Sequence, residues 1–169
     1  MCKLASRDTV LVTSRDLEDT LRIGETLGQL LNSQHLVCLS GDLGAGKTTF
    51  ARGVGRGWGT TQRITSPTFT IVNVYQRPDD QQQLYHIDAY RLHSSDAVFS
   101  IGFDDILAAQ GPILIEWPQH LLSVLPKDCL WITLEIQDDD EQRLLTFEAT
   151  GPIHQDLLQC FNQQMVNWK

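Results

Sequence analysis

Residues 41–48 read Gly-Asp-Leu-Gly-Ala-Gly-Lys-Thr, which fits the pattern Gly-x-x-x-x-Gly-Lys-Ser/Thr. Glycines allow positive φ angles and let consecutive backbone N–H groups point inward, which makes a concave site for an anion. The apolar run His35–Ser40 comes just before and predicts a strand buried on both faces, and a helix is expected to start near Lys47. The positive end of that helix dipole strengthens the anion site. The stretch therefore predicts a phosphate-binding loop (P-loop) between a buried strand and a helix.

The chemistry of a nucleoside triphosphate explains the residue types in this loop. Lys47 can reach the β- and γ-phosphates, and the Thr48 hydroxyl is a hard oxygen ligand suited to Mg²⁺. The nucleotide is expected to contact the following loop residues: Asp42, Leu43, Gly44, Ala45, Gly46, Lys47, Thr48 and Thr49.

Two carboxylates stand at the ends of predicted strands, where a P-loop needs an acid to hold or orient the metal. Glu116 ends the fully apolar run Ile113–Ile115, and Asp88 ends the segment Leu-Tyr-His-Ile-Asp. A parallel strand beside the first one would bring Glu116 to the carboxyl edge, where ligands bind in open α/β sheets. We therefore assign Glu116 to Mg²⁺ and Asp88 to the attacking water or the metal's second shell. For Asp88, an exposed carboxylate at a strand end is the alternative.

The base is less well determined than the phosphates. Guanine-specific GTPases use Asn-Lys-x-Asp, and this tetrad is absent from the sequence. Adenine is favoured by default.

The rest of the chain predicts an α/β fold, with a P-loop NTPase-like mixed sheet of central parallel strands and antiparallel hairpins flanked by helices. Thr13 and Ser14 are candidate N-caps for an amphipathic helix, and the glycines from Gly53 to Gly59 are expected to end the P-loop helix irregularly. The other expected elements are a strand at 9–12, a helix at 16–31, a hairpin of 70–75 and 84–90 around a polar turn, one or two short helices at 94–109 interrupted at Gly102, a strand at 113–115, a helix after it with Pro118 in the first turn, a closing hairpin of 130–136 and 145–149 joined across 138–141, and a helix at 153–166.

Composition bounds the class of protein. The 169 residues predict a single P-loop ATPase domain, 1–169. A net charge of −8 argues against binding nucleic acid or an anionic membrane over a broad basic surface. The four cysteines lie too far apart for a Cys-x-x-Cys motif, and Cys38 and Cys129 are expected in the core of a cytoplasmic protein. Neither a signal peptide nor a membrane span is expected.

Four blocks together resemble the TsaE family, small bacterial ATPases needed to make threonylcarbamoyladenosine in tRNA. They are Gly41–Phe50, Ser-Pro-Thr-Phe at 66–69, Tyr-His-Ile-Asp-Ala-Tyr-Arg-Leu at 85–92 and Ile-Glu-Trp-Pro at 115–118. The resemblance covers roughly residues 16–126. It departs from the family pattern between Arg91 and Gly111, where the family usually carries more glutamates, and this puts partner contacts there in doubt.

The resemblance implies a partner-dependent ATPase that works with TsaD and TsaB proteins, with ATP and Mg²⁺ as cofactors. The acidic chain fits a system in which the partners hold the tRNA. Carried over by position, Thr48 and Glu116 would bind Mg²⁺, and Lys47, Asp88 and Thr68 would be catalytic, with Thr68 in a loop that senses the γ-phosphate. Trp117 would lie near the nucleotide; the roles of Tyr90 and Arg91 stay open.

Two other functions compete with a slow ATPase acting as a switch. One is a small-molecule or nucleoside kinase, which needs an acceptor pocket and usually an arginine-bearing lid. No arginine cluster follows Arg91 until Arg143. The other is a nucleotide-binding interaction module without turnover, against which the presence of Asp88 and Glu116 argues.

Overall fold

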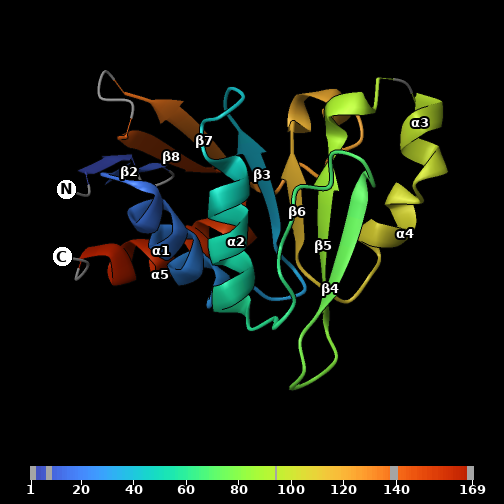
Figure 1. Ribbon diagram of the computed structural model, residues 1–169, viewed down its shortest axis with the longest axis horizontal. Helices are drawn as coiled ribbons and strands as arrows, with labels where there is room; N and C mark the ends of the chain where they lie inside the picture. Colours follow the sequence, from blue (N-terminus) through green and yellow to red (C-terminus); the bar gives the residue numbers. More distant parts are fainter. Residues whose placement is uncertain (1–2, 7–8, 94, 138–140, 167–169) are drawn as a thin grey trace.

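The computed structural model describes residues 3–6, 9–93, 95–137 and 141–166 (Figure 1). Within these ranges the strands are β1 (Lys3–Ser6), β2 (Thr9–Ser14), β3 (Leu36–Ser40), β4 (Val72–Gln76), β5 (Gln83–Asp88), β6 (Ile113–Glu116), β7 (Leu130–Ile136) and β8 (Arg143–Ala149). The helices are α1 (Leu17–Gly28), α2 (Lys47–Trp58), α3 (Ser95–Ser100), α4 (Phe103–Leu107) and α5 (Pro152–Val166), with 3₁₀ turns η1 (Ala89–Arg91) and η2 (Pro118–Leu121).

The described strands form one eight-stranded sheet in the order β1-β2-β8-β7-β3-β6-β5-β4. Its centre is parallel, because β3 pairs in parallel with both β6 and β7, and β6 pairs in parallel with β5. Both sides are antiparallel: β7 with β8, β8 with β2 and β2 with β1 on one side, and β4 with β5 on the other. The predicted mixed α/β sheet, both hairpins included, is confirmed. Of the predicted turn at 138–141, residues 138–140 lie outside the described residues.

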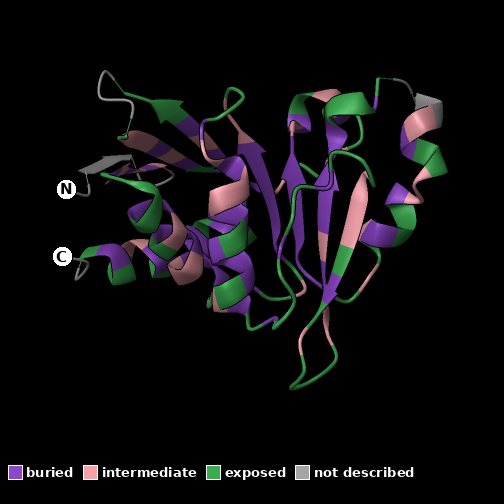
Figure 2. Ribbon diagram, in the orientation of Figure 1, coloured by how far each residue is buried: buried purple, intermediate pink, exposed green. Residues whose placement is uncertain are grey.

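Each face of the sheet has its own hydrophobic core, and the central strands between the two cores are buried (Figure 2). Side chains alternate across β3, so Val37 and Leu39 join the core under α1, α2 and α5, while Leu36 and Cys38 join the core under α3 and α4. This two-sided burial explains why β3 is a continuous apolar run rather than an alternating one. Cys38 and Cys129 are both buried, as expected.

Helices α1 and α2 pack with their backbones in close contact, through glycines on both helices. A Cβ atom placed on Gly53 would lie 2.0 Å from the carbonyl oxygen of Leu21, and one on Gly57 would lie 1.9 Å from that of Glu25. Gly24 and Gly28 of α1 meet the carbonyl oxygens of α2 in the same way, at 2.3 and 2.1 Å. The expectation that glycines disrupt the end of α2 is therefore wrong. The helix continues to Trp58 and stops at Gly59, whose φ of 99° provides a left-handed cap.

The start of α1 also differs from the sequence expectation. Its N-cap is Asp16, whose carboxylate accepts a hydrogen bond from the Asp19 amide at 2.8 Å. Ser14, one of the predicted caps, is instead the last residue of β2, because it pairs with Arg143 of β8. The helix ends at Gly28 rather than near Leu31.

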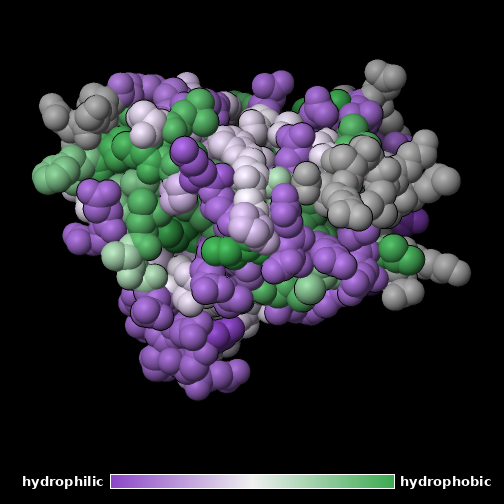
Figure 3. Space-filling view, turned by 180° about the vertical axis from the view of Figure 1, so that it is seen from behind, coloured by the Kyte–Doolittle hydropathy of each residue, from purple (hydrophilic) through white to green (hydrophobic). Residues whose placement is uncertain are grey.

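The β4–β5 hairpin projects from the body of the molecule, and its tip is hydrophilic (Figure 3). Asp79, Asp80 and Gln81 are exposed there, in agreement with the predicted polar turn. Among the described helices, none combines the length and apolar composition needed to cross a membrane.

A buried histidine pair lies at the start of β3, at the opposite end of this strand from the P-loop. His154 of α5 accepts a hydrogen bond from the Leu36 amide through Nε2 at 2.9 Å, and its Nδ1 bonds to Asp128 at 2.6 Å. His35 packs edge-on against the His154 ring, and its Nδ1 accepts a hydrogen bond from the Asn32 amide. Burial lowers the pKa of His35 to about 4; His154 adds to this lowering, and Asp128 opposes it.

Replacing Gly57 by alanine should destabilise the protein, although the same change inside an exposed helix usually stabilises it. The new Cβ would meet the Glu25 carbonyl, so α1 and α2 must separate, at a cost of about 2 kcal/mol or more. Urea unfolding measures the change. Arg56→Ala, on the exposed side of the same helix, is the control and should change stability by less than about 0.5 kcal/mol. Equal stabilities of Gly57→Ala and wild type would contradict the close helix contact.

Stability should decrease as the pH falls from 6.5 to 4, in part because of His35. Since its folded pKa is lowered, the unfolded chain binds a proton in this range that the folded chain does not, and folding loses about 2–3 kcal/mol. His35→Asn keeps an acceptor for the Asn32 amide but cannot titrate, so its unfolding free energy should fall less over the same range. Parallel pH profiles of the two proteins would show that His35 does not contribute.

Candidate functional site

The loop between β3 and α2 has the backbone geometry of an anion cradle. Gly41, Gly44 and Gly46 have φ angles of 140°, 83° and 103°, in the left-handed region that favours glycine. Gly46 is the N-cap of α2 and has no side chain with which to cap the first turn, so the N–H groups of that turn are suited to an external anion. A Cβ on Gly44 would meet nothing within 4 Å, which shows that the crest of the loop is open.

Lys47 folds back over this loop. Its ammonium donates hydrogen bonds to the carbonyl oxygens of Gly41 at 2.7 Å and Asp42 at 2.9 Å, and it lies 4.3 Å from the centre of the Trp117 ring. Burial lowers the pKa of Lys47, while the charges of Glu116, Asp42 and Asp88 act in the opposite direction. The side chain is thus a buried cation held at the mouth of the P-loop.

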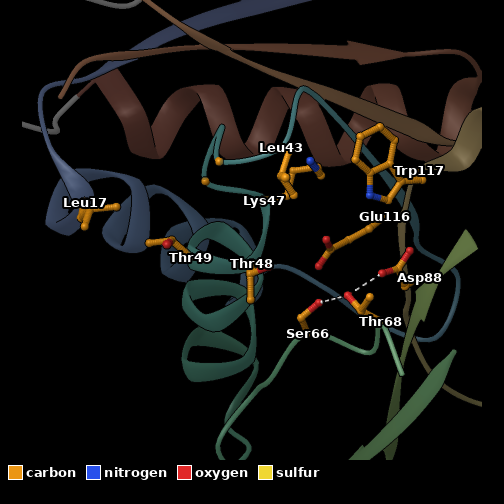
Figure 4. A pocket seen from close by; sticks show the side chains of 12 residues that line it. Leu17, Leu43, Lys47, Thr48, Thr49, Ser66, Thr68, Asp88, Glu116 and Trp117 are labelled. Carbon is orange, nitrogen blue, oxygen red and sulfur yellow. Dashed lines mark hydrogen bonds between the residues drawn. The ribbon is translucent and has the colours of Figure 1, made fainter. Parts of the chain in front are cut away.

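The two predicted acids come from neighbouring parallel strands. Asp88 ends β5 and Glu116 ends β6, and the two residues are register partners. Glu116 is also the register partner of Leu39 in β3, just before the P-loop. Both acids are buried, at 5% and 3% exposure, and Figure 4 shows Glu116 extending between Thr48 and Asp88. The strand pairing therefore brings the acids and the loop to one edge of the sheet.

Thr68 lies beside Asp88 in a chain of hydrogen bonds (Figure 4). The Thr68 hydroxyl donates to Asp88 Oδ2 at 2.9 Å and lies 2.7 Å from the hydroxyl of Ser66. Asp88 Oδ1 accepts from the amide of Tyr90, which fixes the start of η1. The guanidinium of Arg91 donates to the Thr68 carbonyl. Both oxygens of Asp88 are thus oriented by its neighbours.

These side chains line one cleft with a volume of about 250 Å³. The cleft contains most of the predicted site residues: Leu43, Gly44, Gly46, Lys47, Thr48, Thr49, Thr68, Asp88, Glu116 and Trp117. The predicted residues Asp42 and Ala45 do not line it. Asp42 is exposed, with its carbonyl turned to Lys47, while Ala45 is 1% exposed and its carbonyl accepts a hydrogen bond from Arg143.

Three residues near the cleft were not singled out by the sequence. Leu17 and Ser66 line it, and His86 contacts Glu116 from behind, with Nε2 2.9 Å from Oε1. Ser66 and His86 stand inside motif blocks, so their position was a signal, but nothing in the sequence indicates their contacts. Leu17 reaches the cleft from the first turn of α1, and no local pattern marks it.

Comparison with known proteins gives the family of this chain. Residues 14–145 match the family model described as threonylcarbamoyl adenosine biosynthesis protein TsaE. The chain belongs to the TsaE family. The match includes every predicted site residue.

Individual relatives cover most of this TsaE-family chain. The tRNA threonylcarbamoyladenosine biosynthesis protein TsaE of Treponema pallidum is 39% identical over 131 residues, which is 78% of this chain and 95% of the relative. The Bacillus subtilis protein of the same name is 39% identical over 134 residues, 79% of this chain and 82% of the relative. The crystal structure of Bacillus subtilis YdiB superposes with a TM-score of 0.79 at 30% identity and covers 97% of both chains.

Proposed function

We propose that this chain is a Mg²⁺-dependent ATPase that acts as a partner-dependent switch, with TsaD and TsaB proteins, in the biosynthesis of threonylcarbamoyladenosine in tRNA. The observation that carries the proposal is the cleft itself, where a glycine cradle, Lys47 and two buried carboxylates meet at one edge of the sheet. The family membership of the chain supplies the pathway.

The residues of the cleft fit a magnesium nucleotide. The N–H groups of the P-loop and the first turn of α2 would bind the phosphates, with Lys47 as the counter-charge. The Thr48 hydroxyl and the Glu116 carboxylate are hard oxygen donors that line the same cleft, as a Mg²⁺ ligand set requires. Bound Mg²⁺ would neutralise charge on the phosphates.

Asp88 and Thr68 fit the catalytic roles. Asp88 is a buried carboxylate at the cleft, positioned to orient a water molecule or accept its proton. Thr68 stands opposite the P-loop and donates to Asp88, so a γ-phosphate that attracts the Thr68 hydroxyl would also alter the hydrogen bonding of Asp88. This coupling gives the loop around Thr68 the properties of a nucleotide sensor.

Exposed apolar side chains support dependence on a partner. Leu43 in the P-loop and Phe69, directly after Thr68, are each 91% exposed. Leu43 lines the cleft and Phe69 follows a residue that does, so a protein that covers the cleft would bury both and gain hydrophobic free energy. TsaB and TsaD proteins are proposed to occupy this surface, and they would bind the tRNA.

The partner dependence is tested by measuring ATP hydrolysis of the purified chain alone and with TsaB and TsaD. We expect slow turnover alone and faster turnover in the complex, because a lone P-loop often lacks the groups that stabilise the charge of the transition state. Equal rates with and without the partners would contradict the switch. Phosphate transfer to a metabolite instead of water would indicate a kinase.

Lys47→Ala should weaken ATP binding about 10- to 100-fold, because a charge-assisted contact to the phosphates is lost. Isothermal titration calorimetry measures the affinity. Lys127→Ala removes an exposed lysine outside the cleft and serves as the matched control, with unchanged binding. Wild-type affinity in Lys47→Ala would count against the P-loop assignment.

Asp88→Asn should keep ATP affinity within about threefold and reduce hydrolysis about 10²- to 10⁴-fold, because the amide has nearly the same shape but cannot accept a proton. A radiolabelled-phosphate release assay measures turnover. The exposed hairpin residue Asp79, changed to asparagine in the same way, should leave both quantities unchanged. Unaltered turnover in Asp88→Asn would remove this carboxylate from the mechanism.

A further inference from the structure

His86 is a fully buried polar side chain directly behind the cleft. It lies two residues before Asp88 in β5, so the two side chains share one face of the sheet. The register pairs His86 with Leu114 and Asp88 with Glu116, which places His86 one step from Glu116 on the neighbouring strand. Its Nε2 lies 2.9 Å from Glu116 Oε1, and its exposure is 0%.

The other ring nitrogen of His86, Nδ1, is buried, and among the described residues nothing forms a hydrogen bond with it. An unsatisfied buried polar atom costs about 1–3 kcal/mol, which an apolar residue at this position would avoid. Leu84, on the same face of β5, is such a residue. Burial of the ring itself therefore does not explain His86, and what the structure shows the ring doing is pairing with the buried carboxylate of Glu116.

The bond matters because a glutamate carboxylate has no strong rotational preference of its own about its last torsion angle. Within the described ranges, the hydrogen-bond partner of the Glu116 carboxylate is Nε2 of His86. Because His86 is fully buried, this bond holds Oε1 toward the protein interior. The Glu116 side chain itself extends toward Thr48 in the cleft (Figure 4). The second oxygen is then left to face the ligand.

We propose that His86 is a positioning residue that donates through Nε2 to Glu116 Oε1 and so orients the other carboxylate oxygen of Glu116 toward the Mg²⁺ of a bound nucleotide. This inference rests on the proposed function. Outer groups that orient a metal ligand typically change metal affinity 10- to 100-fold when they are removed. His86 thus affects the Mg²⁺ concentration that nucleotide binding requires, whereas Lys47 and the P-loop amides bind the phosphates.

The test compares His86→Leu, which removes the donor, with His86→Gln, whose side-chain amide can donate from a similar place. Calorimetry with a non-hydrolysable ATP analogue measures affinity in EDTA and over a Mg²⁺ series. Mg²⁺ raises the affinity for the nucleotide, and we expect His86→Leu to need an about 10- to 100-fold higher Mg²⁺ concentration than wild type to reach half of this gain. Its affinity in EDTA should stay within about threefold of wild type. His86→Gln should stay within about threefold in both quantities.

His154→Leu is the matched control. This histidine is also buried, at 1% exposure, and also bonds to a carboxylate, but it lies at the other end of β3. Its loss should lower the melting temperature without changing the Mg²⁺ requirement. A double variant with Glu116→Gln separates the roles further: His86→Leu should add no loss of metal affinity once Glu116 is gone, whereas additive losses would contradict an action through Glu116.

Several outcomes would overturn the inference. A Mg²⁺ requirement of His86→Leu equal to that of wild type would do so, and so would a failure of His86→Gln to preserve it. If His86→Leu does not fold, ¹⁵N NMR of wild type decides: we expect the proton on Nε2, and a proton on Nδ1 alone would remove the donor. Wild-type nucleotide binding that ignores Mg²⁺ would overturn the proposed function itself, and with it this inference.

Discussion

The parallel register of β3, β6 and β5 is the constraint on which the site depends. The register pairs Glu116 with Leu39 on one side and with Asp88 on the other. The start of the P-loop and both acids therefore lie at the same level of the sheet. Side chains alternate along a strand, and a shift of one residue would turn both acids to the other face, into the core under α3 and α4. The apolar residues on both faces prevent such a shift, so the packing of two cores also positions the chemistry.

The charges gathered at this edge are stable because each has partners. Lys47, Asp88 and Glu116 are no more than 6% exposed, and a buried charge without compensation would cost several kcal/mol. Lys47 is held by two loop carbonyls, Asp88 by the Thr68 hydroxyl and the Tyr90 amide, and Glu116 by His86. These neighbours set the positions of the charged groups before any ligand arrives, which is the general requirement of an efficient site.

One unfavourable backbone conformation lies at the same edge of the sheet. Trp117 has a φ of 58°, which costs a residue other than glycine roughly 1–2 kcal/mol, and its amide donates to the Leu39 carbonyl. This turn out of β6 brings the indole ring over Lys47 and closes one wall of the cleft. The strain is thus located beside the groups that we propose bind the nucleotide. Strained residues are commonly found at functional sites, and the surrounding core maintains the strain.

The sequence by itself determined the strand–loop–helix unit, the two hairpins and the identity of most residues in the cleft. These features follow from local patterns: the spacing of glycines, the periodicity of side chains and acids at strand ends. A local pattern can be read from the sequence because it involves only residues that are neighbours in the chain. Only the tertiary structure decided that Ser14 belongs to β2, because its partner Arg143 lies far along the chain. In the same way, only the tertiary structure shows that the glycines of α2 allow close packing against α1. It also shows that His86 contacts Glu116, thirty residues later in the chain. Such roles depend on distances between segments, and only the packed fold sets those distances.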